Sequence, residues 1–150
     1  MKKLLLVAAA LFAGYAFLSS HHSPTLSQSP SVASEQGTSS SDALIAKAFS
    51  SRESNLQVRG EGVVTKLLAD DNSGSRHQRF IVRLSSGQTL LVAHNIDLAP
   101  RINSLQVGDS VQFYGEYEWN EKGGVLHWTH RAPNGSHVAG WLQHRNQRYE

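Results

Sequence analysis

Hydrophobic and polar positions alternate along much of the second half of the chain. The clearest case is residues 77–84, where Phe80, Val82 and Leu84 are separated by more polar positions. A period of two is typical of an antiparallel strand that packs one face on a core and exposes the other. Four more runs, each bounded by turn residues, have strand character: residues 58–68, 89–94, 110–119 and 125–130. The pattern therefore predicts five strands.

The connections between these strands favour one architecture. Most are short turns, but the segment between the third and fourth strands, residues 95–107, is too long for a hairpin and contains Pro100. A short helix or a turn fits there. Five strands with such an excursion follow the order of the oligonucleotide/oligosaccharide-binding (OB) fold, a partly open Greek-key barrel. We predict a mainly β protein with a small five-stranded OB-like Greek-key barrel, and another small barrel or sandwich is the alternative.

The first part of the chain differs in composition from the rest. Residues 1–20 combine two lysines, an apolar run and two serines, which is the pattern of a secretory signal peptide. The apolar run of residues 4–18 is short for a membrane span, so we favour cleavage over an N-terminal anchor. Residues 21–41 are rich in serine and predict a disordered spacer. Residues 43–49, with Ser41 or Asp42 as the cap, predict a short helix at the start of a domain that spans 42–150.

Composition narrows the available chemistry. The chain has no cysteine, which excludes disulfide scaffolds, thiolate zinc sites and thiol nucleophiles. Without Lys2 and Lys3 the 14 basic side chains become 12, equal to the 12 acidic ones. A domain without excess positive charge is a poor general binder of polyanions.

The second predicted strand carries the first candidate site. His77, Arg79 and Arg83 alternate onto one side, and ligands of OB folds usually lie on the second and third strands. Guanidinium groups bind phosphate, carboxylate or sulfate through paired hydrogen bonds. The aromatic side chains that would complete a stacking platform are Tyr114, Trp119 and Trp128. The alternative is a solvated strand face whose charges pair with Glu61, Glu116 or Glu118.

Histidines near the C-terminal end form the second candidate site. Imidazole is the best remaining ligand for transition metals in a chain without cysteine. In the competing interpretation as an enzyme, His127, His130 and His137 are the predicted metal ligands, with Asp97 or Glu116 as the base. Side chains three positions apart on a strand point to opposite faces, so this set requires the strand to end or bulge. The alternative is that the histidines are structural.

Several segments together resemble a family of short secreted bacterial proteins that is known only as a domain of unknown function. These segments are residues 76–80, 93–101, 115–120, 124–130 and 140–141. The resemblance covers residues 42–150. It implies a bacterial envelope or secreted location and implies no activity.

These patterns predict an exported OB-like module, periplasmic or secreted, that binds an anionic or sugar-containing ligand such as an oligosaccharide or a nucleic acid. If residues 1–20 are retained, the protein is anchored in the inner membrane. The alternative function is a metal-assisted hydrolase or nuclease, and a third is a structural protein that binds an envelope partner. No cofactor is expected for the module, whereas the enzyme requires a divalent transition metal. The sequence does not decide whether the protein is an enzyme, nor its oligomeric state.

Overall fold

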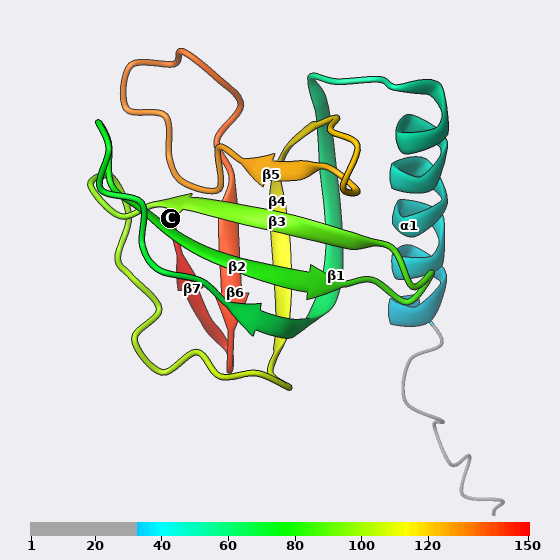
Figure 1. Cartoon of the computed structure of the whole chain (residues 1–150), viewed down its shortest axis with the longest axis horizontal. Coiled ribbons are helices and arrows are strands. Elements are labelled where there is room, and N and C mark those ends of the chain that lie inside the picture. Colours follow the sequence, from blue (N-terminus) through cyan, green and yellow to red (C-terminus); the bar gives the residue numbers. More distant parts are fainter. Residues whose placement is uncertain (1–32) are drawn as a thin grey trace, which may run out of the picture. The chain divides into compact units, whose positions relative to one another are not determined.

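Five strands close into a barrel in the computed structural model, which describes residues 33–150 (Figure 1). They are β1 (Leu56–Leu67), β2 (His77–Arg83), β3 (Thr89–Asn95), β4 (Ser110–Glu118) and β5 (Val125–His127). The barrel order is β1-β2-β3-β5-β4, and β4 pairs back onto β1. The β3–β5 pairing is parallel and the others are antiparallel. This connectivity is that of a small OB-like barrel and confirms the predicted fold class.

Side-chain alternation fills the barrel as the sequence predicts. On β2, Phe80 and Val82 are buried, and on β4 the buried set includes Phe113 and Tyr117. Gly60 on β1 lies directly opposite Phe113, and a Cβ atom at this position would approach the phenyl ring to 2.7 Å. The missing side chain of Gly60 therefore gives the ring its place in the barrel interior.

Helix α1 (Ala33–Ser51) packs on the barrel through Ile45 and Ala48, which are both buried. The helix begins ten residues before the predicted residue 43, so Ser41 lies inside it, and residues 33–41 of the predicted spacer are helical. The C-terminal turns of the helix dock on the barrel and so stabilise the first turn, whose formation is unfavourable by itself. Each residue added toward the N-terminus then contributes one hydrogen bond, which explains the earlier start of the helix. Residues 1–32, with the predicted signal peptide and most of the spacer, lie outside the described residues. Within the described part of the chain, no helix is long and apolar enough to cross a membrane.

Two short strands beyond the predicted five extend the sheet. They are β6 (Trp141–His144), which pairs with β4, and β7 (Gln147–Tyr149), which pairs with β6. Arg145 and Asn146 join them with φ angles of 49° and 64°, as in the tight hairpin turns with two positive φ values. At four and three residues these strands are too short for period two to reveal them in the sequence.

Candidate functional site

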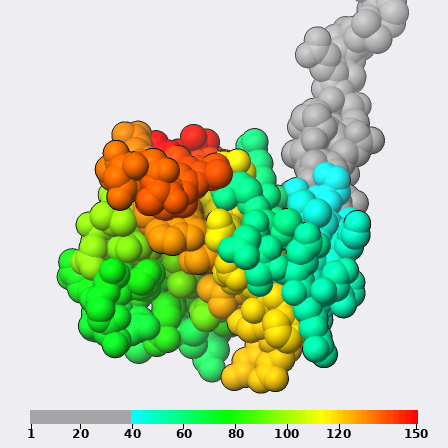
Figure 2. Space-filling model, turned by 90° about the horizontal axis from the view of Figure 1, so that it is seen from above, coloured from blue at the N-terminus to red at the C-terminus, as the bar shows by residue number. Residues whose placement is uncertain are grey.

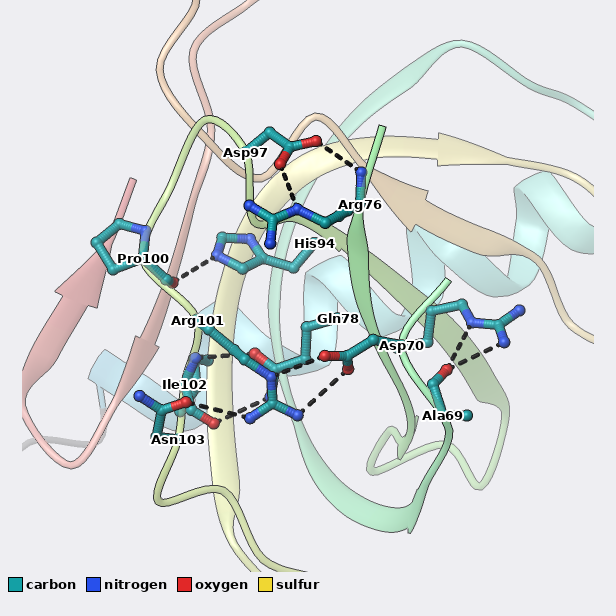
Figure 3. Close-up of polar contacts among 11 residues, drawn as sticks. Ala69, Asp70, Arg76, Gln78, His94, Asp97, Pro100, Arg101, Ile102 and Asn103 are labelled. Atoms are coloured by element: carbon teal, nitrogen blue, oxygen red, sulfur yellow. Dashed lines mark hydrogen bonds and ion pairs between the residues drawn. The ribbon is translucent and has the colours of Figure 1, made fainter. Parts of the chain in front are cut away.

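The long connection between β3 and β4 contains turns but no helix, and side-chain bonds fix it over β2 (Figure 3). The buried Gln78 side chain accepts a hydrogen bond from the Ile102 N–H at 2.8 Å and donates one to the Ile102 carbonyl at 3.0 Å. Arg101 donates to both carboxylate oxygens of Asp70, at 2.9 and 3.2 Å. The segment is therefore held at fixed points along its length.

Asp97, one of the two predicted bases, belongs to this network. Its carboxylate accepts hydrogen bonds of 2.7 Å from both the backbone N–H and the side chain of Arg76. These bonds hold the pKa of Asp97 below its ordinary value. A carboxylate that is already occupied and weakly basic is better suited to fixing the loop than to accepting a proton.

The predicted basic face of β2 is formed, but its arginines differ in availability. His77, Arg79 and Arg83 alternate outward, as predicted. Arg79 donates from Nε and a terminal nitrogen to the Ala69 carbonyl, at 3.1 and 3.0 Å. Arg83 is exposed, and within residues 33–150 it has no ion pair. One free guanidinium therefore remains of the predicted pair.

The three predicted aromatic partners lie in different places. Trp119 donates from its indole N–H to the Phe49 carbonyl of α1 at 3.1 Å, which makes it an anchor of the helix. Tyr114 lies beside Trp141, with the ring centroids 6.2 Å apart. Trp128 lies among histidines. Among the described residues, no hydrogen bond, ion pair or ring contact joins Tyr114 or Trp119 to the basic face of β2, so a single stacking platform stays a prediction.

Trp128 is the centre of an imidazole cluster, which we define as Trp128, His130 and His137. Its φ of 49° breaks the strand, so β5 ends at His127 instead of His130. His137 stacks on the indole with centroids 4.2 Å apart, and the two imidazole centroids are 4.9 Å apart. The segment after β5 that carries these residues forms part of the surface seen in Figure 2.

Hydrogen bonds define the proton positions in the imidazole cluster. The Nδ1 atoms of His130 and His137 lie 2.6 and 2.8 Å from the backbone carbonyls of Arg131 and Val138. A carbonyl only accepts, so each Nδ1 carries the hydrogen, and a neutral ring then has its lone pair on Nε2. Burial lowers the pKa of His130, although the Arg131 carbonyl partly opposes this effect. His130 is therefore a neutral acceptor at pH 7.

His94 is a structural histidine. It is fully buried, with Nε2 3.2 Å from the Pro100 carbonyl and Nδ1 2.8 Å from the Thr129 hydroxyl. The carbonyl requires a hydrogen on Nε2, so Nδ1 accepts from the hydroxyl. Burial lowers the pKa of His94 to about 4, which keeps the ring neutral.

His127 lies between the imidazole cluster and two carboxylates of β4, with its ring centroid 5.2 Å from that of Trp128. Its Nε2 lies 3.5 Å from Glu116 Oε1 and 3.9 Å from Glu118 Oε1. We call these three residues the carboxylate–imidazole site. Within residues 40–150 they are the one group of three or more His, Asp or Glu residues whose possible metal-ligand atoms all lie within 4.8 Å of one another. This group does not include His130 or His137 of the predicted metal set, because β5 ends at the turn of Trp128 and the Nε2 atom of His127 points to β4.

Two polar atoms at the carboxylate–imidazole site have no hydrogen-bond partner. His127 Nε2 is buried and unpartnered, and so is Nε2 of Gln57, whose residue is paired with Glu116 across β1 and β4. Burial lowers the pKa of His127, although the charges of Glu116 and Glu118 partly offset it. A neutral imidazole thus stands beside two carboxylates. Sequence reasoning did not consider Gln57. It named Glu118 only as a charge partner of the basic face, although Glu116 and Glu118 share a strand face by their spacing.

Comparison with known families gives one match. The model of a protein family described as "Protein of unknown function (DUF3465)" matches residues 28–150. No curated protein matches the chain. The match covers the whole barrel and most of the chain, and it agrees with the resemblance seen in the sequence. The chain therefore belongs to the DUF3465 family of proteins of unknown function.

Proposed function

We propose that this OB-like domain is a metal-dependent binding module, in which Glu116, Glu118 and His127 hold a divalent transition-metal ion on the outer face of the barrel. One observation carries the proposal. The buried Nε2 of His127 has no hydrogen-bond partner and lies 3.5 and 3.9 Å from two carboxylate oxygens.

These distances suit a shared ion better than a direct bond. A hydrogen bond from nitrogen to oxygen is typically about 2.9 Å long. Ligand atoms about 2.1 Å from a tetrahedral ion lie about 3.4 Å from one another, close to the His127–Glu116 separation. A buried polar atom without a partner costs about 1–3 kcal/mol. A cation would satisfy the imidazole nitrogen and neutralise the two carboxylates at once.

The donor set also favours a ligand-binding ion. One imidazole and two carboxylates suit zinc, manganese or iron, and three protein ligands leave coordination positions for another molecule. The three side chains are 22–34% exposed, so the site lies at the surface, although Nε2 of His127 itself is buried. An ion here would attract anionic groups or sugar hydroxyls. The basic face of β2 is less suited to this role, because Arg79 is already bonded to the Ala69 carbonyl.

The neighbouring imidazole cluster supports a second candidate, a metal-assisted hydrolase. Trp128 of this cluster lies beside His127, with the two ring centroids 5.2 Å apart. The Nε2 lone pairs of His130 and His137 suit the role of a base that accepts a proton from metal-bound water. In this form of the proposal a cluster histidine is the base in place of Asp97 or Glu116, and Glu116 is a metal ligand. Export to the bacterial envelope also remains a proposal, supported by residues 1–20 and the family resemblance.

The test is a calorimetric titration of the purified protein, free of affinity tags and chelator, with Zn²⁺ and Mn²⁺. We expect one equivalent of at least one ion to bind. The Glu116→Gln and Glu118→Gln variants should each weaken binding by at least about tenfold, because each removes a charged ligand. Glu61→Gln is the matched control, since Glu61 is also an outward carboxylate near β4, bonded to Gln112. Absence of binding, or equal binding by Glu116→Gln and Glu61→Gln, would overturn the proposal.

A further inference from the structure

A row of basic and aromatic side chains crosses four strands next to the carboxylate–imidazole site. Arg59 on β1 is opposite Tyr114 on β4, and Tyr114 is opposite Trp141 on β6. The guanidinium carbons of Arg59 and Arg148 lie 5.3 and 4.4 Å from the centroid of the Trp141 ring. Arg148 comes from β7, so arginines from the two outer strands of this row contact the same indole.

The indole preorganises these two arginines. Trp141 is only 9% exposed, whereas both arginines are exposed. A guanidinium that packs on an aromatic ring is restrained, yet its N–H groups remain available for an anion. Because the side chains are already ordered, an anion that binds them loses less conformational entropy.

The charges of this pair are incompletely neutralised. Arg59 has no ion pair within the described residues. Arg148 lies 3.9 Å from a carboxylate oxygen of Glu150, which is beyond hydrogen-bond distance. The other carboxylate oxygen of Glu150 accepts a 2.6 Å hydrogen bond from Arg131. Both guanidinium groups near Trp141 therefore keep unused donors.

The row lies directly beside the carboxylate–imidazole site. Tyr114 and Glu116 are two positions apart on β4, and so are Arg59 and Gln57 on β1. Residues two apart on a strand share a face and are about 7 Å apart. The carboxylate–imidazole site and the two arginines therefore lie next to each other on one continuous outer surface.

We propose that Arg59 and Arg148 form an oxyanion clamp on Trp141 that takes the phosphate group of a phosphate ester. The clamp binds phosphate by itself, and only its cooperation with a metal ion rests on the proposed function. Phosphate fits better than a single carboxylate, because its tetrahedral oxygens can accept from two separate guanidinium groups and also reach a neighbouring cation. Tyr114 lies between the carboxylate–imidazole site and the two arginines, where it would contact the esterified part of the ligand.

The test follows the indole N–H resonance of Trp141 by NMR while metal-free protein is titrated with inorganic phosphate at constant ionic strength. We expect a saturable shift that acetate does not reproduce. Arg59→Gln and Arg148→Gln should each weaken binding about tenfold, as expected for the loss of a charge-assisted contact. Arg52→Gln, which removes an exposed arginine that packs on a different indole, Trp119, at 5.4 Å from the ring centroid, is the matched control and should bind as the unaltered protein does. The two clamp arginines are exposed, and thermal unfolding checks that each variant is folded.

Thymidine 5′-monophosphate and glucose 6-phosphate then identify the source of the phosphate. Binding of either ester through Arg59 and Arg148 supports the clamp. The ester that binds with higher affinity indicates whether the natural ligand is a nucleotide or a sugar phosphate. No phosphate binding by metal-free protein, or equal loss in Arg52→Gln, would refute the clamp even if a metal ion binds. Phosphate binding that persists when metal binding fails would keep the clamp and reject the metal proposal.

Discussion

His94 should make the folded protein sensitive to mild acid. The ring is fully buried, and both nitrogens are hydrogen-bonded in the neutral form, to Pro100 and Thr129. Burial lowers the pKa of His94 from 6.5 to about 4. Between these pH values the unfolded chain binds a proton at this residue, whereas the folded protein does not.

The sign and size of the effect follow from this difference. When the folded pKa of a base is depressed, the full stability is present above the unfolded pKa and decreases as the pH falls. The interval from 6.5 to about 4, at about 1.36 kcal/mol per pH unit, corresponds to a loss of about 3 kcal/mol. This loss is a large part of the 5–15 kcal/mol that stabilises a typical domain. His127 and His130, whose pKa values are also lowered, act in the same direction.

The assay compares urea unfolding of the protein and of His94→Gln at pH 7, 6, 5 and 4. A glutamine amide can accept from the Thr129 hydroxyl and donate to the Pro100 carbonyl, but it does not titrate. The free energy of unfolding should therefore decrease by about 3 kcal/mol more in the unaltered protein than in the variant. Asp97 and Asp109, whose pKa values are lowered, contribute equally to both proteins.

Equal loss of stability in the two proteins would refute this reasoning. If His94→Gln does not fold, NMR titration of the His94 ring in the unaltered protein replaces the comparison. A pKa near 6.5 in that titration would show that burial does not keep the ring neutral.

Three further substitutions test the packing around the site. Gly140→Ala would place a Cβ atom 2.1 Å from the Trp128 carbonyl oxygen. We expect the free energy of unfolding to fall by at least about 2 kcal/mol in thermal unfolding, and the NMR signals of the imidazole cluster to shift. Gln78→Leu leaves the Ile102 N–H and carbonyl without their partners, and should lower the urea unfolding free energy by about 2–4 kcal/mol. Asp42→Ala removes two hydrogen bonds from α1 to the turn between β2 and β3, and should cost about 1–2 kcal/mol and increase amide exchange in the helix. An unchanged stability in any of these variants would contradict the contact concerned.

The strand pattern was the most informative feature of the sequence. The alternation in residues 77–84 predicted which side chains of β2 are buried, and the long connection before Gly108 predicted the barrel order. Both are regular over several residues, so local rules apply to them. The start of α1 and the hairpin of β6 and β7 were missed, because docking extends the helix and the hairpin strands are short.

The candidate site was predicted less completely than the fold. His127 and Glu116 were recognised as potential metal-site residues, but their partnership depends on the pairing of β4 with β5. Trp119 was assigned to a ligand platform, whereas its indole contacts α1. Residue type therefore identified candidate chemistry without indicating which groups would meet.

The sequence by itself determined the class of fold, the inward and outward faces of the long strands, and the restriction of the chemistry to imidazole, carboxylate and guanidinium groups. These properties depend on residue type and on spacing of a few positions. Only the tertiary structure decided that Arg79 binds the Ala69 carbonyl, that the turn at Trp128 gives His127 and His130 different polar partners, and that Arg59 and Arg148 meet at one indole. These outcomes depend on strand register and on one backbone angle, which bring together residues far apart in the chain.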